Sequence, residues 1–125
     1  MSLDEDELLA GSLGVAASRH LKKNVLEIDL TLAMPPAAAA KRTRQVLGEL
    51  GRELDSRDEG KPGDWQVVGI VAAGLGSLNP AVVTVTIRAA DKGSSKLVVR
   101  GAAKEGLIKQ RAGESAAQRV AEALA

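Results

Sequence analysis

A run of 23 residues without a charged side chain, residues 65–87, constrains the fold more than any other feature of the sequence. Because a helix of roughly 20 apolar residues crosses a bilayer, the run must first be tested as a membrane span. It does not fit one, since glycine, proline, asparagine and threonine interrupt it and residues 74–80, GLGSLNP, have the composition of a turn. The run instead predicts two strands, residues 65–73 and 81–89, joined by a short surface connection.

The first of these two strands is apolar on both of its faces. Its side chains alternate between two apolar sets, Trp65, Val67 and Val71 on one side and Val68, Ile70 and Ala72 on the other. Strands that are buried on both faces have this pattern, whereas a half-exposed strand alternates apolar with polar residues. We therefore expect the second face of the sheet to be covered, either by the N-terminal segment, residues 1–23, or by a second copy of the chain.

A further strand and a long helix are predicted before this run. In residues 24–32, NVLEIDLTL, leucine or isoleucine recurs at every second position, which is typical of a half-buried strand. Pro35 and Pro36 then open a helix, because proline is favoured in the first turn, and this helix is expected to end near Arg57. The residues at helical spacing on its inner face are Ala39 or Ala40, Thr43, Val46, Leu47, Leu50 and Leu54.

The C-terminal third of the chain predicts one strand and one helix. Residues 96–101 alternate as a strand, and residues 102–113 resist assignment apart from a short strand around Leu107 and Ile108. The chain then finishes with a predicted helix over residues 115–125. Ser115 and Gln118 stand at capping-box spacing, which indicates that this helix starts at Ser115.

Together these elements predict an α+β fold, a two-layer sandwich in which an antiparallel sheet of about four strands has helices on one face. The order is strand, helix, three strands, helix, and residues 24–125 form a single domain. The preceding segment, residues 1–23, is either a further helix or mobile. The core is thin, because 21 of the hydrophobic residues are alanine and the chain has no phenylalanine or tyrosine.

The chain is poor in the side chains that usually perform catalysis. One histidine and no cysteine cannot supply the ligands of a zinc site, and a Ser-His-Asp triad would have to use His20. Nothing near His20 orients its ring, so we expect an exposed structural histidine. The best catalytic carboxylates, Glu27, Asp29 and Glu105, are not paired at a defined spacing. We therefore expect no enzyme, no cofactor and no metal.

Charge is balanced over the whole chain, with 17 basic and 16 acidic residues, but it is segregated along the sequence. Residues 88–111 carry seven basic side chains and two acidic ones. On adjacent antiparallel strands, Arg88 and Arg100 are expected to share an outer face. The residues of this basic stretch that are candidates for an anion site are Arg88, Lys96, Arg100, Lys104, Lys109 and Arg111. A solvated sheet edge explains the same pattern, because lysine on edge strands opposes aggregation.

Two functional classes remain open at this point. The first, which we favour, is a non-catalytic module that forms homo-oligomers and binds another protein or a small apolar ligand. Its expected interface residues are Leu75, Leu78, Val68 and Ile70. The alternative is binding of an anion, either a phosphate-bearing ligand or nucleic acid, through residues 88–111. Nucleic acid is the weaker partner, because no aromatic side chain lies nearby to stack on a base.

Two broader expectations concern the source and compartment of the protein. The N-terminus MSLDEDELLAG is acidic and lacks the basic region of a secretory signal, which leads us to expect a cytoplasmic protein. The abundance of alanine, glycine, valine and arginine, with two asparagines, is typical of a high-GC bacterium. No membrane span is expected.

Overall fold

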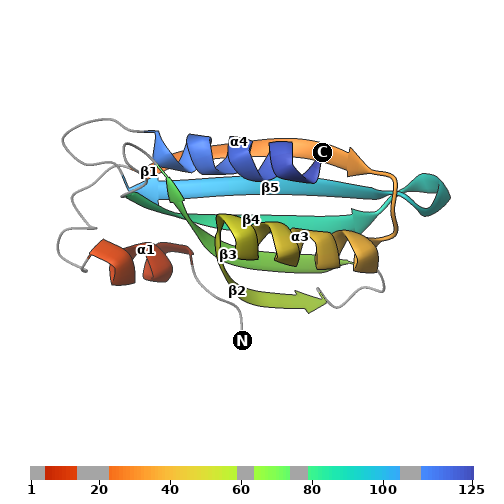
Figure 1. Ribbon diagram of the computed structural model, residues 1–125, viewed down its shortest axis with the longest axis horizontal. Coiled ribbons are helices and arrows are strands. Elements are labelled where there is room, and N and C mark those ends of the chain that lie inside the picture. Colours follow the sequence, from red (N-terminus) through yellow and green to blue (C-terminus); the bar gives the residue numbers. More distant parts are fainter. Residues whose placement is uncertain (1–4, 14–22, 59–63, 74–78, 105–110) are drawn as a thin grey trace.

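The computed structural model describes residues 5–13, 23–58, 64–73, 79–104 and 111–125. These residues form one five-stranded antiparallel sheet with the strand order β1-β5-β4-β3-β2, together with three α-helices (Figure 1). The elements are α1 (Glu5–Leu13), β1 (Lys23–Leu32), α3 (Pro36–Leu50), β2 (Gly51–Asp58), β3 (Trp65–Ala73), β4 (Asn79–Ala89), a 3-10 turn (Asp91–Gly93), β5 (Ser95–Lys104) and α4 (Ala112–Leu124). None of the helices in the described ranges is long and apolar enough to cross a membrane.

The α+β class and the antiparallel sheet predicted from the sequence are confirmed, but the sheet has five strands and not four. The additional strand is β2, which occupies the second part of the predicted helix. The helix ends at Leu50, and Gly51 pairs with Val71 of β3. A Cβ atom at Gly51 would collide with the backbone of Ile70, so only glycine permits this close approach. Leu54 continued the helical spacing in the sequence, yet it lies at a register shift in the strand.

One face of the sheet, here called the core face, is covered by α3 and α4, which lie side by side in Figure 1. The predicted inner face of the helix is confirmed in α3, where the buried residues are Ala39, Ala40, Thr43, Val46 and Leu47. The strands contribute alternate residues to the same core, such as Leu97, Val85 and Val67. Valine and alanine dominate this core, and their small volume lets the helices pack close to the sheet.

Helix α4 begins at Ala112, three residues before the predicted start. Its first residues are Ala112 and Gly113, both buried, so the Ser115–Gln118 pair lies within the helix and does not cap it. The backbone N–H of Glu114 instead donates a hydrogen bond of 2.8 Å to Oδ1 of Asn24 on β1. A side chain from a strand distant in sequence therefore satisfies one of the free N–H groups at the helix N-terminus.

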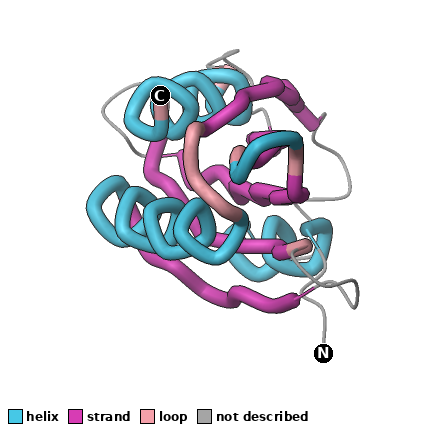
Figure 2. The backbone as a smooth tube through the Cα atoms, turned by 90° about the vertical axis from the view of Figure 1, so that its right-hand side faces the viewer, coloured by secondary structure: helices cyan, strands magenta, loops and turns pink. Residues whose placement is uncertain are grey.

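The opposite face of the sheet, here called the open face, is covered at one end by α1. Leu9 of α1 is 1% exposed and packs with Val68, Val82 and Ala102. Figure 2 shows α1 on the side of the sheet opposite α3 and α4. The apolar second face that the sequence predicted for β3 is therefore covered in part by the N-terminal segment of the same chain.

Candidate functional site

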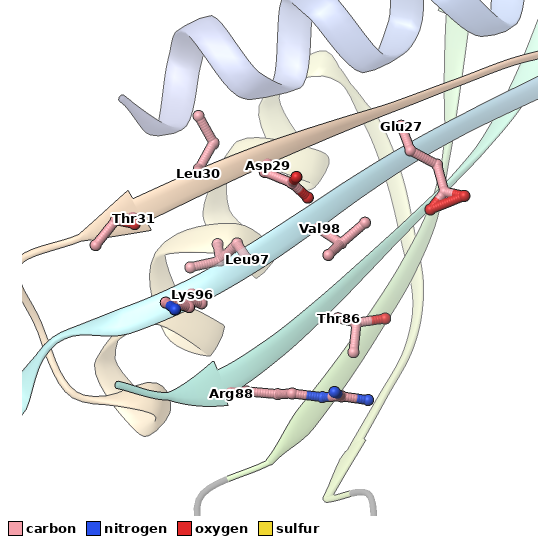
Figure 3. Close-up of a pocket in the computed structure, with 9 residues that line it drawn as sticks. All are labelled: Glu27, Asp29, Leu30, Thr31, Thr86, Arg88, Lys96, Leu97 and Val98. Atoms are coloured by element: carbon pink, nitrogen blue, oxygen red, sulfur yellow. The ribbon is translucent and has the colours of Figure 1, made fainter. Parts of the chain in front are cut away.

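A hollow of about 630 Å³ lies on the open face of the sheet, over β1, β5 and β4. It lies toward the 3-10 turn, at the opposite end of these strands from the part that Leu9 covers. The residues that line it, shown in Figure 3, are Glu27, Asp29, Leu30, Thr31, Thr86, Arg88, Lys96, Leu97 and Val98. Three strands of a paired sheet position these side chains, so the backbone of the hollow is rigid.

The strand register sets which of these side chains are neighbours. In one row across the sheet, Thr31 pairs with Lys96 and Lys96 pairs with Arg88. In the next row, Asp29 pairs with Val98 and Val98 pairs with Thr86. Because alternate residues of a strand point to the same face, both rows lie on the open face.

A third row carries the link between the hollow and α1. Glu27 pairs with Arg100 across β1 and β5, and their side chains form an ion pair of 3.3 Å. Arg100 also forms an ion pair of 3.0 Å with Glu5 at the start of α1. Lys23 forms ion pairs with both Glu5, at 2.5 Å, and Asp6, at 2.8 Å. These contacts hold α1 against the sheet beside the hollow.

The charges at this junction favour one another's ionised forms. Burial raises the pKa of Glu5, but hydrogen bonds and charges from Arg100 and Lys23 outweigh burial and leave that pKa below its ordinary value. The hydrogen bond to Glu5 raises the pKa of Arg100 above its already high value, although burial opposes it. Arg100 and Glu27 are thus charged partners, and neither brings an unbalanced charge to the hollow.

The remaining charges of the hollow are Arg88, Lys96 and Asp29. Arg88 and Lys96 are directly opposite on β4 and β5, and both are exposed. Within the described part of the chain, none of these three side chains forms an ion pair. Like charges directly opposite on neighbouring strands are destabilising, and none of the described carboxylates forms an ion pair with Arg88 or Lys96 to offset this repulsion.

The structure separates the basic residues that the sequence grouped into one candidate anion site. Arg88 and Lys96 line the hollow, and Arg100 shares their face but is bound by Glu5 and Glu27. Lys104 lies at the far end of β5, opposite Lys23. Arg111 precedes α4 in a left-handed conformation (φ 51°) and is exposed, and Lys109 lies outside the described residues.

The expected interface residues also fall in different surroundings. Val68 is 4% exposed beneath Leu9 of α1, and Ile70 is half-buried on the same strand. Leu75 and Leu78 lie outside the described residues, as do His20 and Glu105. Among the residues that the structure describes, no group of histidine, cysteine, aspartate and glutamate could hold a metal ion.

Sequence reasoning missed five residues that line the hollow, which are Leu30, Thr31, Thr86, Leu97 and Val98. It named Glu27 and Asp29 only as isolated carboxylates and did not connect them with Arg88 and Lys96. The outward positions of each strand were visible in the alternating pattern. The grouping of these positions into one site was not visible in the sequence, because it depends on which strands are neighbours and on their register.

Comparison with known proteins adds no family to these observations. No protein-family model matches the sequence, and no curated protein matches it. Among solved structures, the chain is similar to the crystal structure of the Zhui aromatase/cyclase from Streptomyces sp. R1128, with 15% identity over 82% of this chain and 84% of that one. The TM-score is 0.35, which is too low for the function of that protein to be transferred to this chain.

Proposed function

We propose that this protein is a non-catalytic module that binds a small anionic ligand, a carboxylate or a phosphate, in the hollow on its open face. The observation that carries the proposal is the pairing of Arg88 with Lys96 across β4 and β5, at a place where the described chain provides neither of them with a carboxylate. The electrostatic repulsion between these two cations is offset when an anion binds between them.

The chemistry of the two cations suits one small anion. The planar guanidinium of Arg88 presents a fork of N–H donors to two oxygens of a carboxylate or phosphate, and the ammonium of Lys96 adds a compact charge. The hydroxyl of Thr31 lies in the same row as the two cations, that of Thr86 lies in the next row, and both offer further donors. All four side chains stand on paired strands, so the backbone needs no ordering when the anion binds, and the cost is that of fixing the exposed Arg88 and Lys96 side chains, about 0.5–1.5 kcal/mol each.

The composition of the hollow favours a polar ligand over an apolar one. Of its three apolar residues, Leu97 is 1% exposed and belongs to the core, and Leu30 packs against the same core. Val98 is the apolar side chain left to contact a ligand from the open face. The binding of a small apolar ligand, expected first from the sequence, therefore has less support than the binding of an anion.

The non-catalytic role remains a prediction from the sequence. Thr31 and Thr86 are the hydroxyl side chains that line the hollow, and within the described residues no base forms a hydrogen bond with either of them. A hydroxyl nucleophile needs an adjacent base to become reactive. Self-association of the chain remains a prediction and is not required to complete the hollow.

The test is calorimetric titration of the full chain with inorganic phosphate and, separately, with butyrate. Replacing Arg88 or Lys96 by glutamine should weaken binding tenfold or more, since a charge-assisted hydrogen bond contributes roughly 1.5–3 kcal/mol, which is a change of about 10- to 150-fold in affinity. Lys41→Gln is the matched control, because Lys41 is exposed on α3, which packs on the core face. Equal weakening in all three variants, or no binding of either anion at millimolar concentration, would overturn the proposal. The tighter of the two anions identifies the ligand class.

A further inference from the structure

We infer that the hollow takes a bipolar ligand, with an anionic group bound by Arg88 and Lys96 and a cationic group bound by Asp29, separated by a short apolar spacer. This inference rests on the proposed binding of an anion and adds the second end of the ligand. It is carried by the arrangement of acid, apolar and basic side chains across three neighbouring strands.

The acidic and basic sides of the hollow are separated by a valine. Asp29 on β1 is directly opposite Val98 on β5, and Val98 is directly opposite Thr86 on β4. Figure 3 shows Val98 between Asp29 on one side and Thr86 and Arg88 on the other. A ligand that reaches from β1 to β4 therefore crosses an apolar side chain between two charged ends.

Asp29 is the carboxylate of the hollow that forms no ion pair within the described ranges. Glu27, its neighbour on the same face of β1, is already paired with Arg100 at 3.3 Å. Asp29 is exposed and forms no ion pair with any described residue. A simple anion gains nothing from Asp29 and is repelled by it, whereas an ammonium group on the ligand would be attracted.

The strand spacing sets the length of such a ligand. β1 and β4 are two strand spacings apart, about 10 Å, and the offset of one row lengthens the path from Asp29 to Arg88 to about 12 Å. This is a backbone separation, and side chains that stand roughly perpendicular to the sheet keep their charged groups at about the same separation. A hydrogen bond of roughly 2.9 Å at each end then leaves about 6 Å between the two charged groups of the ligand. This length suits an amine and an acid joined by about three methylene groups and exceeds that of an α-amino acid.

The test compares γ-aminobutyrate with butyrate, which differ only in the amino group. The full chain should bind γ-aminobutyrate about three- to fivefold more tightly, as expected for one exposed ion pair. Asp29→Asn should abolish this preference and leave butyrate binding equal or tighter, because the repelling charge is gone. Glu49→Gln also replaces a carboxylate by an amide, but at an exposed position of α3, and it should keep the preference for γ-aminobutyrate.

A second pair of probes tests the spacing. Glycine and acetate also differ by an amino group, but the two charges of glycine are too close to reach both sides of the hollow, so we expect no preference between them. Any of three results would overturn the inference: tighter binding of glycine than of acetate, equal binding of γ-aminobutyrate and butyrate, or a preference for γ-aminobutyrate that survives Asp29→Asn. In each case, binding of butyrate would leave the proposed function standing. If γ-aminobutyrate binds more tightly than butyrate and Arg88→Gln weakens both four-carbon probes equally, the inference is supported.

Discussion

Asn24 on β1 caps helix α4, because its Oδ1 accepts a hydrogen bond of 2.8 Å from the backbone N–H of Glu114. The first residues of α4 offer no side-chain cap of their own, and Arg111 precedes the helix in a left-handed conformation. The bond joins residues 90 positions apart, so it also ties the C-terminal helix to the first strand of the sheet.

Loss of this cap should destabilise the fold. Asn24→Ala is expected to lower the free energy of unfolding by about 0.5–2 kcal/mol, the usual cost of removing a helix N-cap. Urea unfolding followed by the fluorescence of Trp65, the single tryptophan, measures the change. Asn24→Asp keeps the acceptor and adds a negative charge near the helix N-terminus, so it should preserve stability. Equal losses in the two variants would contradict a capping role.

Two glycines should respond to alanine in opposite directions. A methyl group at Gly101 on β5 would collide with the carbonyl of Gly113 and the backbone N of Ala117, so α4 would have to move. Gly101→Ala should cost roughly 1–3 kcal/mol of unfolding free energy, as other overpacked positions do. Gly48 on α3 has no atom near the added methyl, and Gly48→Ala should stabilise by about 0.5–1 kcal/mol. Similar effects of both changes in urea unfolding would refute this account of how α4 packs.

The ion pairs of α1 predict a loss of stability in acid. The pKa of Glu5 is lowered in the folded chain from its ordinary 4.5, because Arg100 and Lys23 outweigh the effect of burial. Its contribution is therefore fully present above the unfolded-state pKa and is lost as pH falls through the lowered folded-state value. The Lys23 ammonium lowers the pKa of Asp6 as well, from 3.8, which extends the loss to lower pH.

The measurement is the difference in unfolding free energy between the unmodified protein and Glu5→Gln. This difference should be about 1 kcal/mol at pH 7 and should shrink steadily below about pH 4.5, as the carboxylate is protonated in both folded and unfolded chains. Glu7→Gln serves as the control, since Glu7 is exposed on the same helix. A difference that stays constant down to pH 3 would show that Glu5 acts through packing and not through its charge.

Removing Leu9 should uncover the apolar end of the open face. Leu9→Ala leaves Val68, Val82 and Ala102 without their cover, and we expect a loss of about 2 kcal/mol or more in stability together with stronger self-association. Sedimentation velocity over a range of concentrations measures the association. Val25→Ala is the control, because Val25 is already 36% exposed on β1. Unchanged sedimentation of Leu9→Ala would mean that the apolar patch under α1 does not drive self-association.

The alternation and helical spacing of the sequence determined the strands β1, β3 and β4 closely and identified the buried side of α3. These features are local: a period of two or of 3.6 residues decides which side chains share a face, whatever lies opposite. The same reasoning failed after Leu50, where Leu54 continued the helical period. Residues 51–58 pair with β3 there instead, and Gly51 permits the change because its missing side chain lets the backbone approach Ile70.

Only the tertiary structure decided which charged side chains lie together in the hollow. The sequence placed Arg88 on an outward face and Lys96 in the same basic stretch, but their direct opposition depends on the register between β4 and β5. Asp29 joins them because β1 lies beside β5, which is distant along the chain, and Arg100 is removed from the site because α1 brings Glu5 to it. Strand order and register result from burying the whole core at once, and no local pattern encodes them.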